Sequence, residues 1–513
     1  MEWENGSGNV EAERSRLSEP SIPTIENLTR LHLNIPEHIS VSASLHATSE
    51  LNKIYEISVD NGAQYYAFKV TLPFCPRLKT QSEVATMRLV RQLTTPVFVP
   101  KVFAHDDSSD NELGYEWILM EFVHGQSLYN RWRHLSMREK ERVFGALADM
   151  QGRLMRSDNR FTGLGSAVSL GQGKSQPGLS LSQRAAKPVS CLNQAASQAT
   201  LRLSQAASQP NAIRTQAVSQ ANFSLAPMAS ISWCHDLARP NSGFGPYRST
   251  RDWFKARAKA AIEEQLRLLR EAEAEGNKDY EESAKKDITL GERFLLLLNR
   301  YARGCDSFPT NTVLQHPDLD LDKIMIDDNG QLSGITGWDF SATMPQWRAV
   351  QLPRLWRGRD RYIRPDRDGY SDFDPDVDEL DPGGKTDTYW DHLREYELTQ
   401  LRKVYLDRLE EHIPGCTKIS AMAAFAMDFD AALEELELDA FFGRVGDWLS
   451  AVEKGTVEAT LGYKAFQCIY RKSHEDCAEF ADGCGLHRAD GGLKLGCFPA
   501  RCHSMAQGSS DQS

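Results

Sequence analysis

A chain of 513 residues has room for roughly two to four domains, and a single two-lobed enzyme with insertions also fits this length. The formal net charge of −12 argues against a nucleic-acid partner or an anionic membrane surface, but it permits cationic small substrates. No run approaches the roughly 18 apolar residues of a membrane span, and the acidic amino-terminal stretch does not resemble a targeting peptide, so we expect a cytoplasmic protein.

The first third of the chain predicts a polar tail followed by a small sheet. Residues 1–36 are polar and predict a disordered tail. Residues 52–59 and 64–70 alternate around the turn Asp60-Asn-Gly62, which is typical of a β-hairpin. Thr80-Gln-Ser-Glu83 resembles a capping box that opens a helix, and strands at 99–103 and 115–122 follow. Residues 37–123 therefore predict an antiparallel sheet with one helix.

The next segment, 124–460, predicts a mainly helical domain with an insertion. Helices are expected after the capping box Ser136-Met-Arg-Glu139, after Ser249, and through most of 390–455. Residues 166–230 carry an eleven-residue repeat, in which Gln194-Ala-Ala-Ser-Gln198 recurs at 205–209. One Leu per repeat cannot supply the seam of a right-handed coiled coil, so we expect a disordered low-complexity insertion. A short tandem DNA duplication would leave the same period, and mistranslated intron sequence would look similar.

Two further segments carry weak metal signals. Residues 461–513 contain five cysteines but no Cys-x2-Cys pair, which favours a disordered tail over a zinc-dependent interaction module. The acidic segment 366–381 lacks the glycine and glutamate that a calcium loop needs, since Val377 and Gly383 stand at those places. It predicts a solvated loop.

The chemistry is concentrated in residues 313–346. The loop His316-Pro-Asp318-Leu precedes two short apolar runs that flank the turn Asp327-Asp-Asn-Gly330, a strong hairpin signal. A loop aspartate before a short hairpin is the layout of kinase-type phosphoryl-transfer enzymes. Asp318 is therefore the candidate that orients and deprotonates a hydroxyl group. A turn-capping role for Asp318 is the alternative.

This stretch resembles the aminoglycoside phosphotransferase family, in particular its fungal branch. The resemblance extends to the segment around Lys69, the helix after it, and residues 110–125. It implies an α+β, bilobal protein-kinase-like fold with a small antiparallel sheet lobe and a mainly helical lobe. It also implies ATP and Mg²⁺ as cofactors and phosphoryl transfer to a small-molecule hydroxyl. The matching positions are His316, Asp318, Leu319, Ile324, Ile326, Asp327, Gly334, Ile335, Trp338 and Asp339.

The resemblance also implies roles for individual residues. Lys69 takes the place of the cation that contacts the nucleotide phosphates, and Glu83 the place of its orienting partner. Met120 and Glu121 stand where backbone groups receive adenine. His316 joins Asp318 in the catalytic loop, with a structural role beneath it. Taken alone, Lys69 is more often a solvated strand lysine and Glu83 is the capping-box acid, and only their joint spacing favours the pair.

Two departures from the family pattern affect metal binding. Lys323 stands where the family has a magnesium-binding Asn, and Gly337 where it has a metal-binding Asp. An ammonium group at Lys323 would repel Mg²⁺ and could pair with Asp318 or with a phosphate. Asp339 could serve as a substitute ligand. The loop at 47–53 contains no glycine, which weighs against tight ATP binding.

Besides the zinc-dependent interaction module, which the cysteine spacing of the tail disfavours, two hypotheses remain open from the sequence. One is an ATP-dependent phosphotransferase that works through displaced metal ligands. The other is a catalytically impaired pseudo-enzyme that acts as a nucleotide-binding or scaffold module.

Overall fold

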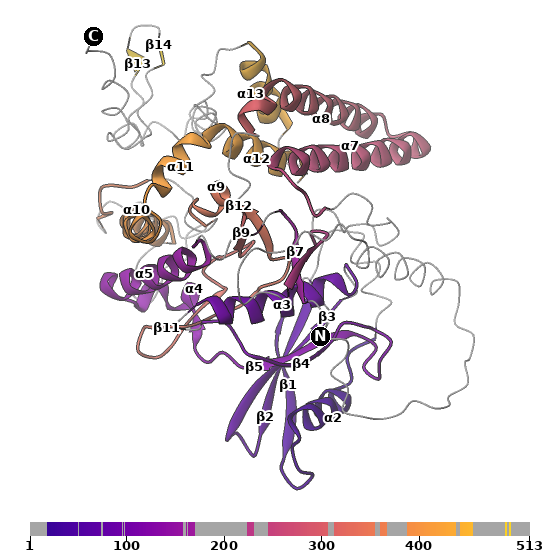
Figure 1. Ribbon diagram of the computed structural model, residues 1–513, viewed down its shortest axis with the longest axis vertical. Helices are drawn as coiled ribbons and strands as arrows, with labels where there is room; N and C mark the ends of the chain where they lie inside the picture. Colours follow the sequence, from indigo (N-terminus) through magenta and orange to yellow (C-terminus); the bar gives the residue numbers. More distant parts are fainter. Residues whose placement is uncertain are drawn as a thin grey trace, which may run out of the picture.

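The computed structural model has a sheet lobe at the amino-terminal end and a mainly helical lobe beyond it (Figure 1). This is the α+β, bilobal kinase-like arrangement that the sequence predicts. The described residues are 18–49, 51–72, 75–94, 96, 98–156, 161, 163–169, 223–229, 245–305, 312–353, 360–366, 387–437, 442–454, 488–489 and 492–493.

The sheet lobe is built on five antiparallel strands in the order β1-β2-β3-β5-β4. Alternate residues of β2 are buried, as the apolar-polar alternation predicts, and they pack with Phe68 and Trp117 in one core. The predicted hairpin at Asp60-Asn-Gly62 joins β2 to β3. The strands are β1 (Val41–Thr48), β2 (Asn52–Val59), β3 (Gln64–Thr71), β4 (Val102–Asp106) and β5 (Glu116–Glu121).

Helix α2 (Ile22–Leu33) corrects the prediction of a disordered tail over residues 1–36. Ser21 caps the helix by accepting a hydrogen bond from the Thr24 backbone N–H. Ile25 and Leu28 are buried in the core of the sheet lobe. The polar composition of the segment hid this pair of core residues at helical spacing, and their burial against the sheet holds the helix.

Helix α3 (Leu78–Leu93) begins two residues earlier than the expected capping box. Arg77 is the N-cap, and it makes no side-chain capping hydrogen bond. Glu83 lies inside the helix and is almost completely buried, so it serves a tertiary contact instead of a cap. The capping-box interpretation of Thr80 to Glu83 was therefore wrong.

The second lobe packs helices around short strand pairs. The predicted hairpin at Asp327 to Gly330 joins β10 to β11, and β6 adds to β10. Helices α5 and α10 share one core with α3 and with these strands. The strands are β6 (Gln126–Ser127), β9 (Thr312–Gln315), β10 (Ile324–Ile326), β11 (Leu332–Ile335) and β12 (Ala342–Pro345), and β12 pairs with β9.

The helices of this lobe largely follow the predicted pattern. The capping box at Ser136 and Glu139 is present at the start of α5, and Ser249 caps α7. Helices α7 and α8 lie side by side as a long hairpin (upper right in Figure 1). The helices are α4 (Leu128–Arg131), η1 (Trp132–His134), α5 (Met137–Leu154), α7 (Thr250–Glu275), α8 (Lys278–Cys305), α9 (Gln346–Ala349), α10 (Asp387–His412), α11 (Cys416–Met422), α12 (Ala424–Glu437) and α13 (Phe442–Lys454).

The edges of the predicted insertion at 166–230 form a ribbon of two strands. β7 (Ser166–Ser169) pairs antiparallel with β8 (Phe223–Ala226), and Phe223 and Leu225 enter the core shared with α3 and α5. The eleven-residue repeats between these strands and the acidic segment beyond 366 lie outside the described residues. Of the predicted tail at 461–513, the described part is the short pair β13 (Arg488–Ala489) and β14 (Gly492–Leu493).

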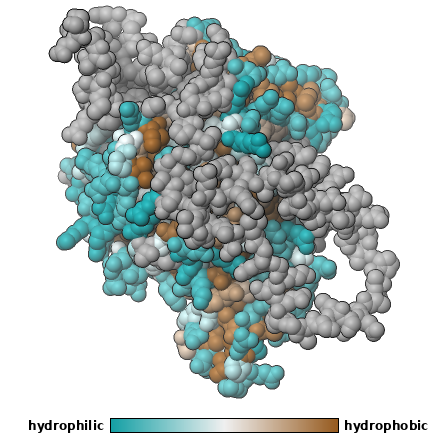
Figure 2. Space-filling view, viewed as in Figure 1, coloured by the Kyte–Doolittle hydropathy of each residue, from teal (hydrophilic) through white to brown (hydrophobic). Residues whose placement is uncertain are grey.

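Hydrophilic residues cover most of the described surface in Figure 2, and hydrophobic residues reach it over the sheet lobe and over α7 and α8. Within the described parts of the chain, no helix has the length and apolar character needed to cross a membrane.

Candidate functional site

Lys69 on β3 and Glu83 on α3 form a buried ion pair between strand and helix. The ammonium nitrogen of Lys69 lies 2.7 and 2.8 Å from the two carboxylate oxygens of Glu83. Both side chains are almost fully inaccessible, at 4% and 3% exposure. The structure thus brings together the pair that the resemblance implies. Their contact with nucleotide phosphates stays a prediction.

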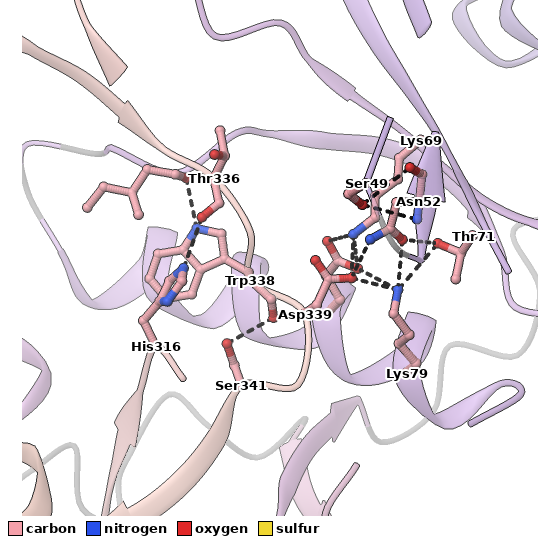
Figure 3. Close-up of polar contacts among 12 residues, drawn as sticks. Ser49, Asn52, Lys69, Thr71, Lys79, His316, Thr336, Trp338, Asp339 and Ser341 are labelled. Atoms are coloured by element: carbon pink, nitrogen blue, oxygen red, sulfur yellow. Dashed lines mark hydrogen bonds and ion pairs between the residues drawn. The ribbon is translucent and has the colours of Figure 1, made fainter. Parts of the chain in front are cut away.

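Asp339 completes this ion pair from the other lobe (Figure 3). Its Oδ1 lies 2.6 Å from the ammonium nitrogens of both Lys69 and Lys79, and it accepts a longer hydrogen bond from Asn52 Nδ2 at 3.4 Å. Two buried lysines therefore face two carboxylates, the buried one of Glu83 and the partly buried one of Asp339. We call Lys69, Lys79, Glu83 and Asp339 the charge cluster.

The pKa shifts in the charge cluster follow from this arrangement. Burial alone would raise the pKa of Asp339, but the ammonium groups of Lys69 and Lys79 outweigh burial and hold that pKa well below its ordinary value. Burial raises the pKa of Glu83, and the negative charge of Asp339 raises it further. Burial alone would lower the pKa of Lys69, but Asp339 and Glu83 raise it. Asp339 is thus the firmly ionised partner that keeps Lys69 charged.

Lys79 and Asn52 were not identified from the sequence. Lys79 is fully buried and also donates to Asn52 Oδ1 at 3.0 Å, while Thr71 Oγ1 donates to the same oxygen at 3.0 Å. One signal was available, because Lys79 and Glu83 are four residues apart and so share a helix face. The prediction that the helix began at Thr80 removed Lys79 from that face.

His316 holds the candidate catalytic loop from below. The Asp318 backbone N–H donates to His316 Nδ1 at 3.3 Å, so the ring carries its proton on Nε2 and donates to the Thr336 carbonyl oxygen at 2.9 Å. Trp338 packs edge-on against the ring at 4.8 Å between centroids. Burial lowers the pKa of His316, which keeps the ring neutral. These contacts fit a positioning role for His316 beneath Asp318.

Asp318 presents an exposed carboxylate at this loop. Among the described residues its carboxylate makes no hydrogen bond or ion pair, so the turn-capping alternative finds no support in its contacts. The charges of Asp318, Lys323 and Asp339 all act on the His316 ring, so each of these groups lies within electrostatic range of that ring. An exposed, unpaired carboxylate is suited to receive a proton from a bound hydroxyl group.

Met120 and Glu121, the predicted adenine contacts, end the central strand β5. Met120 stands opposite Ala67 of β3 and Val102 of β4. The Glu121 backbone N–H donates to the Lys101 carbonyl oxygen at 2.8 Å, and its side chain accepts from the Lys101 N–H at 3.0 Å. Those polar groups are already paired within the sheet lobe. Adenine contact through these two residues stays a prediction.

The positions of the family's metal ligands do not fit Mg²⁺ in this chain. Gly337 has a backbone φ of +73°, and a Cβ built there would stand 2.8 Å from Lys323 Cδ and 3.0 Å from Lys323 Cε. The lysine stem thus fills the space in which an aspartate side chain would begin. Mg²⁺ requires oxygen ligands in near-octahedral geometry, whereas these two positions offer an ammonium group and no side chain.

The remaining candidate ligand, Asp339, is engaged by two lysines. Among the residues that the structure describes, no group of three or more His, Cys, Asp and Glu side chains could hold a metal ion. A role for Asp339 as substitute ligand would require it to exchange those ion pairs for a metal, and it stays a prediction.

Comparisons with known proteins agree with the family resemblance. Over 123 residues the chain is 37% identical to a subtelomeric hrmA-associated cluster protein of Aspergillus fumigatus. The aligned stretch covers 23% of each of the two chains. Over 160 residues it is 31% identical to altered inheritance of mitochondria protein 9, mitochondrial, of Komagataella phaffii, or 29% of this chain and 25% of that one. The matched stretches thus span about a quarter of these relatives' lengths.

A similar solved structure is the ADP-bound aminoglycoside phosphotransferase APH(2'')-Ib, with a TM-score of 0.38, 11% identity, and coverage of 83% of this chain and 96% of that one. The profile of the family described as "Phosphotransferase enzyme family" matches residues 47–382, which is more than half of the chain. The chain therefore belongs to the phosphotransferase enzyme family.

Proposed function

We propose that this protein binds ATP between its two lobes and transfers the γ-phosphoryl group to a hydroxyl group of a small molecule. The observation that carries this proposal is the unpaired, exposed carboxylate of Asp318, on a loop that His316 holds, in a chain that also pairs Lys69 with Glu83 and Asp339. Family membership supports the reaction class.

The proposed reaction forms one bond and breaks one. The acceptor hydroxyl oxygen forms a bond to the γ-phosphorus, while the bond from that phosphorus to the β–γ bridging oxygen breaks and leaves ADP with the electron pair. The hydroxyl proton passes to Asp318. Lys69 supplies positive charge to the phosphates. The phosphates must compete for its ammonium group with Asp339 and Glu83, because both carboxylates already contact that group.

A second candidate function is nucleotide binding without transfer. The observation that favours it is the occupancy of the two metal-ligand positions by Lys323 and Gly337. Loss of well-placed electrostatic groups costs about 10²–10³-fold in rate for each group in enzymes that depend on them.

Two measurements separate the two candidates. Calorimetry measures ATP binding, and a second assay measures ADP release in the presence of cationic and neutral polyhydroxylated compounds offered as acceptors. Transfer predicts ADP release that requires an acceptor and falls at least about 100-fold in Asp318→Asn, with the ATP affinity unchanged. Asp328→Asn, an exposed residue of the hairpin turn, is the matched control. ATP binding with no acceptor-dependent release selects the binding module, and absence of ATP binding in folded protein refutes both.

For the compartment we propose the cytoplasm. One of the relatives above is named as a mitochondrial protein, so the test is the distribution of a carboxy-terminal fluorescent fusion between the cytoplasm and mitochondria. Mitochondrial fluorescence would refute this proposal.

A further inference from the structure

Lys323 and Gly337 form one structural unit. The Thr336 backbone N–H donates to the Lys323 carbonyl oxygen at 2.9 Å, which holds the strand entering Gly337 against the strand leaving Lys323. The stem of Lys323 then lies over the Gly337 backbone, where any Cβ would collide with it. A side chain at 337 therefore requires the flexible stem of Lys323 to move away from this backbone.

The ammonium group of Lys323 makes no ion pair within the described part of the chain, and the carboxylate that it influences is that of its sequence neighbour Asp322. The sequence left two partners open, Asp318 and a phosphate, and no ion pair joins Lys323 to Asp318. Every lysine of the charge cluster, by contrast, is matched by Glu83 or Asp339. Among the described lysines of this site, the one without an ion pair therefore stands at the position that the family uses for a metal ligand.

We propose that this site binds the polyphosphate of a nucleoside triphosphate without a divalent cation, with the Lys323 ammonium group in the place of the metal. The inference rests on the proposed function, since it assumes that the nucleotide binds between the lobes. An ammonium group is a compact cation with three donors, so it can hydrogen-bond phosphate oxygens directly. A second cation in the same place would be repelled by it.

The test is ATP binding by calorimetry, in excess EDTA and again in MgCl₂. For the wild-type protein the dissociation constants in the two conditions should agree within about threefold. Lys323→Met keeps the stem over Gly337 and removes the charge, so it should weaken ATP binding in EDTA about tenfold, the lower end expected for a hydrogen bond to a charged group. Lys403→Met, an exposed lysine of α10, is the matched control and should leave binding unchanged.

A double variant, Lys323→Asn with Gly337→Asp, makes the opposite prediction. It returns both positions to the family's residues and removes the stem that blocks a side chain at 337. ATP binding should become dependent on Mg²⁺, with at least about a tenfold difference between MgCl₂ and EDTA. Tight binding in EDTA that is indifferent to Lys323→Met would overturn the assignment of Lys323.

The failures of the inference and of the proposed function have different signatures. Wild-type binding that strengthens tenfold or more with Mg²⁺ refutes the inference and leaves the proposed function standing. No ATP binding in either condition, from a sample that melts cooperatively, refutes the proposed function itself and the inference with it.

Discussion

Replacement of Asp339 by Asn tests the charge cluster most directly. The substitution keeps the shape of the side chain and its ability to accept hydrogen bonds, but removes the negative charge that Lys69 and Lys79 share at 2.6 Å. Lys69 would then face Glu83 alone. Lys79, which is fully buried, would have its nearest remaining carboxylate 4.0 Å away, also on Glu83. Two buried ammonium groups would depend on one carboxylate.

The size of the effect follows from that imbalance. Removal of one partner from a buried ion pair costs about 3–5 kcal/mol because it leaves an uncompensated charge. The Asp339 side chain is 17% exposed, so water can reach the cluster, and we expect the lower end, about 3 kcal/mol in the free energy of unfolding. Because the folded pKa of Asp339 lies well below its ordinary value, this contribution is present above about pH 4 and is lost only as pH falls through the folded pKa.

Urea denaturation at neutral pH measures the prediction. Asp328→Asn serves as control, because it removes the same charge from an exposed turn and should change the unfolding free energy by less than about 0.5 kcal/mol. The double variant Asp339→Asn with Lys79→Met restores the charge balance and should be less destabilised than the sum of the single variants by about 1–3 kcal/mol. An Asp339→Asn protein as stable as the control would refute the account of the cluster.

Three further predictions concern stability measured by the same method. Burial raises the pKa of Glu116 to about 7, so between about pH 4.5 and 7 folding is accompanied by proton uptake, and the free energy of unfolding falls as pH rises through that range. The stability of Glu116→Gln relative to wild type should therefore increase from pH 5 to pH 8. Parallel pH profiles of the two proteins would contradict this. Ser136→Ala removes the cap whose Oγ accepts from the Glu139 N–H at 3.3 Å, and should cost about 1 kcal/mol. Gly125→Ala should cost about 2 kcal/mol or more, because φ is +124° and the new Cβ would stand 2.3 Å from the Ile326 carbonyl oxygen; a neutral result would show that this turn can relax.

Local patterns predicted those parts of the fold in which one short stretch determines its own structure. The turns at Asp60-Asn-Gly62 and Asp327 to Gly330 both join paired strands. All three residues of the first turn and Gly330 of the second adopt the positive φ angles that such turns need. The Ser136 capping box is present because its two hydrogen bonds are formed within four residues. The pairing of Lys69 with Glu83 came from the family resemblance, and their burial together agrees with it.

Features that depend on distant contacts were not predictable from the sequence. Helix α2 owes its stability to Ile25 and Leu28 packing on strands that follow later in the chain. The contact of Lys79 with Asp339 joins residues 260 positions apart, so no spacing rule could reveal it. The packing of Lys323 on Gly337 depends on a hairpin closing between them. In each case the decisive partner is set by the tertiary fold.

The charge cluster also sets the cost of nucleotide binding, and this gives Asp339→Asn a second predicted effect. A phosphate that reaches Lys69 must compete with Asp339, whose carboxylate already neutralises that ammonium group from the other lobe. If Asp339 acts only as this competitor, its replacement by Asn should strengthen ATP binding in EDTA by about threefold or more, because Lys69 loses one of its two anions. The same replacement should lower the free energy of unfolding.

If Asp339 instead serves as a substitute metal ligand, the same variant should weaken ATP binding in MgCl₂ and leave binding in EDTA unchanged. Calorimetry on one variant in two buffers therefore decides which partner Asp339 has in the nucleotide complex, and the Asp328→Asn control separates this local effect from a change in overall charge.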